Sequence, residues 1–286
     1  MDRAPNTGGP MQDDLIYDIG LHKGVDTQYY LGKGFRVVAV EADPRLAAEA
    51  RETFARAIAE ARLVIVEAAI AAQAGSVRFF RNTQNSEWGT IDAGFAARNE
   101  RFGASSETIE VPAMTFGELL ARHGVPYYLK IDIEGADDLC IAALEASAHR
   151  PRYVSFETAG PVRFDNTLLS LASLVRSGYR SFQLVNQARQ RRVRLPQPAR
   201  EGRWFEHRFK NGSSGPFGDE LMGRWLPLDE FVRDYMRHLR AEDRWSINGR
   251  ARPWRVRLRA AAERLRLVPP LGWFDVHARL DEVARR

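Results

Sequence analysis

The sequence predicts an α/β protein built on a doubly wound, mainly parallel β-sheet. Apolar segments rich in strand-forming residues alternate along the chain with helical segments. The first apolar segment runs from Leu15 to Asp18 and then breaks at Gly20 and Gly24, as a buried strand does where it turns sharply into a helix. A second apolar segment, 35–41, repeats the pattern and ends in Glu41.

The other elements follow from the same periodicities. Asp43 and Thr115 are predicted N-caps, and Pro44 stands at a first helical position. Helices are expected at 25–31, 44–59, 116–122, 136–146, 168–176, 228–239 and 256–267. Further strands are expected at 63–66, 76–80, 108–111, 127–131, 153–157, 181–185 and 204–209, the second of them antiparallel. The polar segment 81–107 has no clear period and is either a surface loop or a lid over a ligand.

Acidic residues stand where five of the predicted strands end. They are Asp18, Glu41, Glu67, Asp132 with Glu134, and Glu157. The carboxyl ends of parallel strands meet at one edge of a sheet, and ligands of doubly wound proteins bind at that edge. The sequence therefore predicts an acidic ligand site there.

The glycine spacing indicates which ligand this edge binds. A nicotinamide dehydrogenase would offer Gly-x-Gly-x-x-Gly after the first strand, but here Gly20 is followed only by Gly24, and no Gly-x-x-x-x-Gly-Lys phosphate loop is present. Glu41 stands at the distance from the loop at which a carboxylate binds ribose hydroxyls. A nucleoside without a pyrophosphate, such as S-adenosylmethionine, fits this pattern better than NAD does.

Three stretches of the chain resemble the FkbM family of S-adenosylmethionine-dependent methyltransferases. They are Asp18-Ile-Gly-Leu-His-Lys-Gly24, Val38-Ala-Val-Glu-Ala-Asp-Pro44 and Leu129-Lys-Ile-Asp-Ile-Glu-Gly-Ala-Asp137, of which the third is the most specific. The resemblance covers roughly Leu15 to Glu157. It implies a class I methyltransferase (Rossmann-like) fold and O-methylation of a hydroxyl on a sugar, glycan or polyketide-type metabolite. The chain departs from the family by carrying Leu21-His22 where Ala-Asn is more usual.

The expected cofactor contacts lie at the first three strand ends and at Asp132. Asp18 and the backbone from Gly20 through His22 to Gly24 are expected to hold the amino-acid end of S-adenosylmethionine. Glu41, followed by Ala42, is expected to bind the ribose hydroxyls, and Glu67 with Ala68 is expected to border the adenine. Asp132 is expected either to bind the cofactor amino group or to cap the following helix, and Asp18 has the alternative of capping the glycine loop.

The candidates for catalysis are Asp132, Glu134, Glu157 and His22, because an alcohol must lose its proton as it attacks a methyl group. Each also has a plain structural alternative: a helix-start acid, a strand-end charge or a bystander in the loop. Asp132, Glu134 and Glu157 could instead converge on a divalent metal such as Mg²⁺. No dedicated metal ligand is assigned on sequence grounds, and sequence alone leaves base and metal open.

Three regions are predicted along the chain. Residues 1–10 form a loose N-terminal tail, 11–187 the cofactor-binding domain, and 188–286 an extension that covers the acceptor site. Residues 250–286 hold ten Arg and four acidic residues, which accounts for the net charge of +5. This basic segment is either a solvated helix or a contact for an acidic partner.

The sequence is less consistent with two other function classes. A nucleic-acid methyltransferase would usually carry an Asn/Asp-Pro-Pro-aromatic tetrad where this chain has Asp132-Ile-Glu-Gly135, so nucleic acid is disfavoured as a substrate. A non-catalytic binding or assembly module of the same fold stays open, although the intact glycine loop and Glu41 argue against a decayed pocket.

The composition agrees with a cytoplasmic enzyme. Cys140 is the single cysteine, which excludes an internal disulfide framework and a cysteine metal cluster and fits a reducing compartment. No apolar run approaches the roughly 20 residues of a membrane span, and the N-terminus lacks the apolar core of a signal peptide. The methyl acceptor and the oligomeric state are left open.

Overall fold

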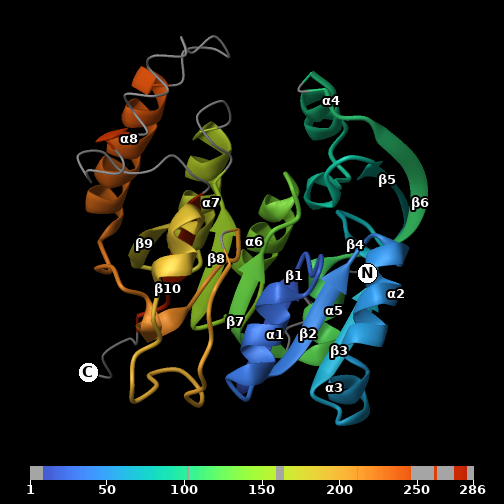
Figure 1. Cartoon of the computed structure of the whole chain (residues 1–286), viewed down its shortest axis with the longest axis horizontal. Coiled ribbons are helices and arrows are strands. Elements are labelled where there is room, and N and C mark those ends of the chain that lie inside the picture. The colour runs from blue at the N-terminus through green and yellow to red at the C-terminus, as the bar shows by residue number, and fades with distance from the viewer. Residues whose placement is uncertain are drawn as a thin grey trace.

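A seven-stranded sheet forms the centre of the protein, with the strand order β3-β2-β1-β7-β8-β10-β9. The computed structural model describes residues 9–101, 103–158, 164–210, 212–245, 261–262 and 274–281 (Figure 1). The strands are β1 (Met11–Ile19), β2 (Arg36–Glu41), β3 (Leu63–Glu67), β4 (Ala69–Ile70), β5 (Gly75–Asn82), β6 (Ser106–Met114), β7 (Val125–Ile131), β8 (Tyr153–Glu157), β9 (Ser181–Asn186) and β10 (Phe274–Arg279). The helices are α1 (Val25–Gly32), α2 (Pro44–Thr53), α3 (Ala55–Ala59), α4 (Ala93–Arg101), α5 (Phe116–His123), α6 (Asp137–Glu145), α7 (Phe164–Arg176) and α8 (Leu228–Trp245), with 3₁₀ turns η1 (Ser86–Trp88), η3 (Gln187–Arg192) and η4 (Gly218–Glu220).

The order and direction of the strands confirm the doubly wound sheet. Strands β3, β2, β1, β7 and β8 run parallel, and β10 lies antiparallel between β8 and β9. The chain winds outward from β1 to β3 and then returns to the other side of β1 with β7. Such a reversal opens a crevice at the carboxyl ends of the two central strands.

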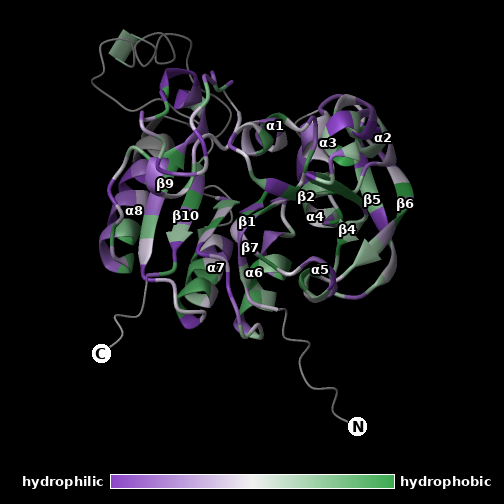
Figure 2. Ribbon diagram, turned by 90° about the horizontal axis from the view of Figure 1, so that it is seen from below, coloured by the Kyte–Doolittle hydropathy of each residue, from purple (hydrophilic) through white to green (hydrophobic). Residues whose placement is uncertain are grey.

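Both faces of the sheet are covered, which explains the continuous apolar runs in its strands. Leu15, Tyr17 and Ile19 of β1 face a core shared with α5, α6, α7 and α8, whereas Ile16 faces α1, α2 and α3. The second core also takes in apolar residues between 193 and 225, so a non-helical segment covers part of that face. In Figure 2 the hydrophobic colour follows the central strands.

A second, three-stranded sheet of order β4-β6-β5 stands beside the main one. In Figure 1 it lies with α4 on the side of the molecule opposite to α8. The Arg81 guanidinium on β5 binds Asp43 at the end of β2 with Nε–Oδ2 at 2.9 Å and Nη2–Oδ1 at 3.1 Å, which fastens the small sheet to the main sheet. The expected strands 76–80 and 108–111 are present and longer than predicted, and the polar segment between them contains η1 and α4.

Several boundaries differ from the sequence prediction. The helix expected at 44–59 is divided at Phe54 into α2 and α3. Residues 204–209 are not a strand; they run without regular structure against α1, where Phe205 and Phe209 pack on Tyr29. The expected tail and the helix at 256–267 lie largely outside the described residues.

The chain after residue 187 supplies part of the main sheet. Strand β10 completes the sheet between β8 and β9, so the expected extension includes a core element as well as a covering segment. Among the described residues, no helix is long and apolar enough to cross a membrane.

Residues 193–225, described here as the covering segment, are anchored to the end of α1 by a buried ion pair. Lys33 Nζ lies 2.7 Å from Glu220 Oε1, and both side chains are inaccessible to solvent. Glu220 also accepts hydrogen bonds from the Tyr29 hydroxyl at 3.0 Å and from the Arg200 backbone at 3.1 Å. The buried Glu220 carboxylate therefore accepts hydrogen bonds from several donors, of which the Lys33 ammonium also supplies the counter-charge.

We expect Lys33→Met to lower the free energy of unfolding by about 3–5 kcal/mol, because it leaves the Glu220 carboxylate buried without its counter-charge. Urea denaturation followed by circular dichroism measures this change. Arg56→Met is the matched control, since it removes an exposed ion pair to Glu60 and should leave the midpoint almost unchanged. Equal midpoints for the two variants would contradict a structural role for the buried pair.

Candidate functional site

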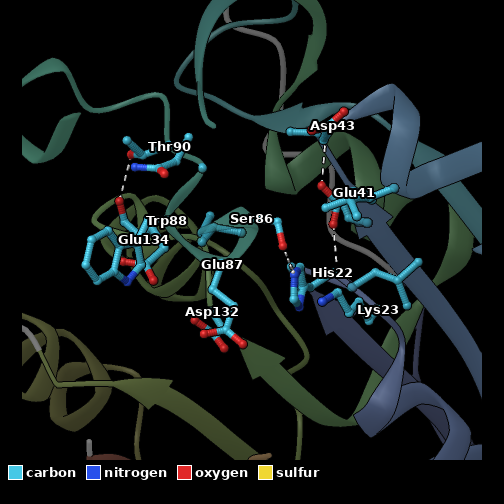
Figure 3. A pocket seen from close by; sticks show the side chains of 18 of the residues that line it. His22, Lys23, Glu41, Asp43, Ser86, Glu87, Trp88, Thr90, Asp132 and Glu134 are labelled. Atoms are coloured by element: carbon cyan, nitrogen blue, oxygen red, sulfur yellow. Dashed lines mark hydrogen bonds between the residues drawn. The ribbon is translucent and has the colours of Figure 1, made fainter. Parts of the chain in front are cut away.

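A cavity of about 500 Å³ opens at the carboxyl ends of the central parallel strands. Its wall comes from the glycine loop after β1, the end of β2, the turns after β3 and β7, the end of β8 and the segment 85–91. Residues Lys210, Gly212 and Ser213 of the covering segment also reach it. Figure 3 shows the side chains that converge on it. The cavity thus lies at the predicted edge of the sheet.

The glycine loop, residues 20–24, packs between the end of β2 and the turn that follows β7. The backbone N–H groups of Gly20 and Leu21 both donate to the Val40 carbonyl, at 3.0 and 2.9 Å. Gly20 has φ +92°, and a Cβ atom there would lie 1.9 Å from the Asp132 carbonyl oxygen. Only glycine allows both this backbone conformation and this close approach.

Glu41 joins the glycine loop to the end of β2. Its Oε2 accepts the backbone N–H of His22 at 2.7 Å, and its Oε1 accepts that of Asp43 at 2.8 Å (Figure 3). The carboxylate lines the cavity although the residue is only 7% exposed. Burial raises its pKa to about 7. Each carboxylate oxygen retains a lone pair for a further donor, which is what two vicinal ribose hydroxyls require.

Lys130 holds the two central strands and the loop together beneath the cavity. Its Nζ lies 3.1 Å from Asp18 Oδ1, 3.5 Å from Asp132 Oδ2 and 3.0 Å from the Gly20 carbonyl oxygen. Burial alone would lower the pKa of Lys130, but the charges of Asp18 and Asp132 outweigh burial and raise it well above the ordinary value. The ammonium is therefore permanently charged and fixes the loop.

Three predicted cofactor residues, Asp18, Gly24 and Glu67, lie outside the cavity wall. Asp18 is fully buried, where its carboxylate accepts the Thr27 hydroxyl at 2.7 Å and pairs with Lys130. Glu67 pairs with Arg51 at 2.6 Å, whereas Ala68 and Ala42 line the cavity. Gly24 is the N-cap of α1 and lies behind the wall. Their assignments to the cofactor stay predictions, and Asp18 and Gly24 would act by holding the loop.

His22 reaches across the cavity mouth. It adopts a left-handed backbone with φ +48°, and its Nε2 lies 2.8 Å from the Ser86 hydroxyl (Figure 3). Burial lowers the pKa of His22, so the ring is neutral at physiological pH. Ser86, Trp88 and Thr90 all line the cavity. The polar segment, which the sequence predicted to be either a surface loop or a lid, therefore borders the ligand site.

Three carboxylates converge at the other end of the cavity. One ligand oxygen from each of Asp132, Glu134 and Glu157 lies within 4.8 Å of the other two. Glu134 has φ +50°, and its carbonyl accepts the Thr90 hydroxyl at 2.7 Å. Burial and the charges of neighbouring acids, Asp132 first among them, raise the pKa values of Glu134 and Glu157 well above the ordinary carboxyl value. Three of the four residues predicted for catalysis are thus brought together, and His22, the fourth, is not part of this group.

The comparisons with known proteins agree with this architecture. Residues 18–188 match the model of the methyltransferase FkbM domain, which is more than half of the chain. The chain belongs to the FkbM methyltransferase family. The seven-stranded sheet is accordingly the class I methyltransferase fold that the sequence resemblance implied.

The solved structures similar to this FkbM chain are distant from it. An FkbM methyltransferase from Methylobacillus flagellatus KT is 15% identical over 62% of this chain and 40% of its own, with a TM-score of 0.40. A precorrin-6y C5,15-methyltransferase from Geobacter metallireducens GS-15 is 14% identical over 63% and 70%, with a TM-score of 0.33. Phosphoethanolamine N-methyltransferase 2 from Haemonchus contortus, solved with S-adenosyl-L-methionine, is 12% identical over 96% and 50%, with a TM-score of 0.36. This chain thus spans about two fifths of the first of these proteins, and no curated protein matches it.

Sequence reasoning missed several residues of this FkbM site. Asp26 of α1 lines the cavity and accepts the Ser214 backbone N–H at 3.2 Å, and burial raises its pKa to about 6. Arg81 and Ser213 also line the cavity. These residues come from segments far apart in sequence, so no local spacing could reveal them. Asp26 could have been found from its position, because it is the second residue of the helix predicted directly after the glycine loop.

We expect Gly20→Ala to weaken binding of S-adenosylmethionine at least tenfold, because the new Cβ would collide with the Asp132 carbonyl and displace the loop. Gly34→Ala is the matched control, since Gly34 also has a positive φ (+95°) but its Cβ would meet nothing closer than 3.6 Å. Both variants bear the cost of a left-handed alanine, about 1–2 kcal/mol of stability. Isothermal titration calorimetry separates them, and equal affinities would show that the loop's position does not matter.

Proposed function

We propose that this protein transfers a methyl group from S-adenosylmethionine to a hydroxyl oxygen of a sugar, glycan or polyketide-type metabolite. Membership of the FkbM family supports methyl transfer, and the glycine loop with Glu41 supports a nucleoside cofactor. The observation that carries the choice of oxygen is the carboxylate cluster of Asp132, Glu134 and Glu157 at the cavity wall.

S-adenosylmethionine supplies a methyl group on a positively charged sulfur. Around it, Glu41 is suited to accept the ribose hydroxyls, and Ala68 offers an apolar surface at the end of β3 for the adenine. Asp132 lines the same cavity and carries the negative charge that suits the cofactor's amino group. The loop residues Gly20–His22 are held against the end of β2 and leave little freedom for the cofactor to tilt.

An acceptor hydroxyl needs a destination for its proton. As the oxygen attacks the methyl carbon, the carbon–oxygen bond forms, the carbon–sulfur bond breaks and sulfur keeps the electron pair. The proton leaves the oxygen in the same process. The carboxylates of Glu134 and Glu157 can accept that proton directly, or the cluster can hold a cation that lowers the pKa of the hydroxyl. Alignment of oxygen, methyl carbon and sulfur accounts for the rest of the acceleration.

Segment 86–91 and the residues Lys210, Gly212 and Ser213 are suited to recognise the acceptor. Both groups line the cavity, and the second belongs to the part of the chain that follows β9. Loops carried on a rigid sheet commonly set substrate choice.

We propose that the reaction takes place in the cytoplasm, where the buried Cys140 would stay reduced.

Calorimetric titration with S-adenosylmethionine, with NAD as the comparison ligand, tests the cofactor. We expect binding of S-adenosylmethionine only, and about 10- to 100-fold weaker binding by Glu41→Gln, because the amide loses charge-assisted hydrogen bonds. Glu60→Gln is the matched control, since Glu60 pairs with Arg56 on α3 and does not line the cavity, and it should bind normally. Binding of NAD, or binding unaffected by Glu41→Gln, would refute the assignment.

The raised pKa of Glu41 predicts that cofactor affinity depends on pH. The ribose hydroxyls bind the ionised carboxylate, so protonation as the pH falls through about 7 competes with binding. We expect the dissociation constant to rise about tenfold between pH 8 and 6. Glu41→Gln removes this titration and should show a much flatter profile, with any residual slope due to Asp26 or His22. Parallel profiles for the two proteins would exclude Glu41 as the titrating group.

A further inference from the structure

The carboxylate cluster carries more negative charge than its surroundings compensate. Within the described part of the chain, no lysine or arginine forms an ion pair with Glu134 or Glu157, and the charge of Arg98 acts on Glu134 only from beyond ion-pair distance. The ammonium of Lys130 is 3.5 Å from Asp132, but it lies closer to Asp18, at 3.1 Å. Carboxylates at this spacing repel one another strongly in a partly buried site unless a proton or a cation lies between them.

A fourth carboxylate stands beside the cluster. Asp275 of β10 is paired in register with Glu157 of β8, so their side chains lie on the same face of adjacent strands. Asp275 is 3% exposed, and its Oδ1 accepts the Gln187 amide at 2.6 Å. Its Oδ2 has no hydrogen-bond partner among the described residues. A buried acceptor without a donor next to Glu157 is an observation independent of the three-residue cluster, and it needs a proton, a water or a cation that the described residues do not supply.

The three cluster residues also have the arrangement of metal ligands. They come from two strand ends and one tight turn, so the backbone of each is fixed. The left-handed conformation of Glu134, held by the Thr90 hydroxyl on its carbonyl, keeps its carboxylate with the other two. All the donors are oxygens, which small divalent cations such as Mg²⁺ and Mn²⁺ prefer.

We propose that Asp132, Glu134 and Glu157 bind a divalent cation of the Mg²⁺ or Mn²⁺ class, and that Asp275 strengthens the site by its negative charge beside Glu157. The inference deepens the proposed function and rests on it for its role. A cation held by these three residues would lower the pKa of a hydroxyl that contacts it, so that the proton could pass to water, and the cluster would then act as ligand and not as base.

Mn²⁺ alone is the probe for the site. The full chain, freed of metal with EDTA, is titrated with MnCl₂ while electron paramagnetic resonance follows the free ion. We expect one Mn²⁺ per chain, at least tenfold weaker binding by Glu157→Gln, and a several-fold loss by Asp275→Asn. Glu110→Gln changes an exposed acid on β6 that lies outside both the cavity and the cluster, and it should bind as the parent does. No bound Mn²⁺, or equal binding by all four proteins, would overturn the inference.

Thermal unfolding gives a second readout that does not depend on activity. In EDTA, Glu157→Gln should melt above the parent protein because it relieves repulsion between carboxylates. Added Mn²⁺ should raise the melting temperature of the parent and leave that of the variant unchanged. A parent melting temperature that is insensitive to Mn²⁺ would contradict the site even if the variant failed to fold.

Cofactor binding separates this inference from the proposed function. S-adenosylmethionine that binds and supports methyl transfer equally in EDTA, without bound Mn²⁺, would overturn the cation site and leave the methyltransferase proposal intact. Bound Mn²⁺ at the cluster without affinity for S-adenosylmethionine would sustain the cation site and refute the methyltransferase role.

Discussion

The position of one buried lysine determines the geometry of the whole site. Lys130 contacts Asp18 on β1, Asp132 after β7 and the Gly20 carbonyl of the loop between β1 and α1. A buried ammonium is stable only with such partners, and the partners in turn need the ammonium. The crevice between the two central strands therefore has a floor of fixed shape. The same loop is held from the other side by Glu41, so cofactor binding and loop geometry depend on one connected set of polar contacts.

Much of this arrangement could be predicted from the sequence, because it follows from local patterns. Strand ends marked by acids, the loop from Gly20 to Gly24 and the alternation of elements were sufficient to define the parallel sheet and the edge that carries the cavity. The sequence left open whether Asp132, Glu134 and Glu157 converge, and the structure brings their carboxylates together. The carboxylates of Asp18 and Glu67 were assigned to the cofactor because they end strands, but a strand end does not decide whether a side chain lines the cavity or turns away from it.

What could not be predicted depends on pairing between distant segments. The small sheet forms only because β5 and β6 pair across a polar stretch with no periodicity of its own, inside which α4 is hidden. Asp275 lies in a short apolar segment near the end of the sequence, and no local pattern indicates that this segment is a strand of the main sheet. Only its pairing with β8 places Asp275 beside Glu157. Residues 204–209 read as a strand because of their aromatic residues, yet those rings pack on Tyr29 and the backbone finds no partner strand.

The placement of β10 has a consequence for how the protein is made. This strand fills the gap between β8 and β9, although it follows β9 by more than eighty residues. A chain still emerging from the ribosome therefore holds β8 with an open edge until residue 279 has appeared, and open edges favour pairing with other chains. Synthesis of this protein thus passes through a vulnerable stage, in which the five parallel strands and β9 lack the strand that lies between them and Glu157 is not yet paired with Asp275.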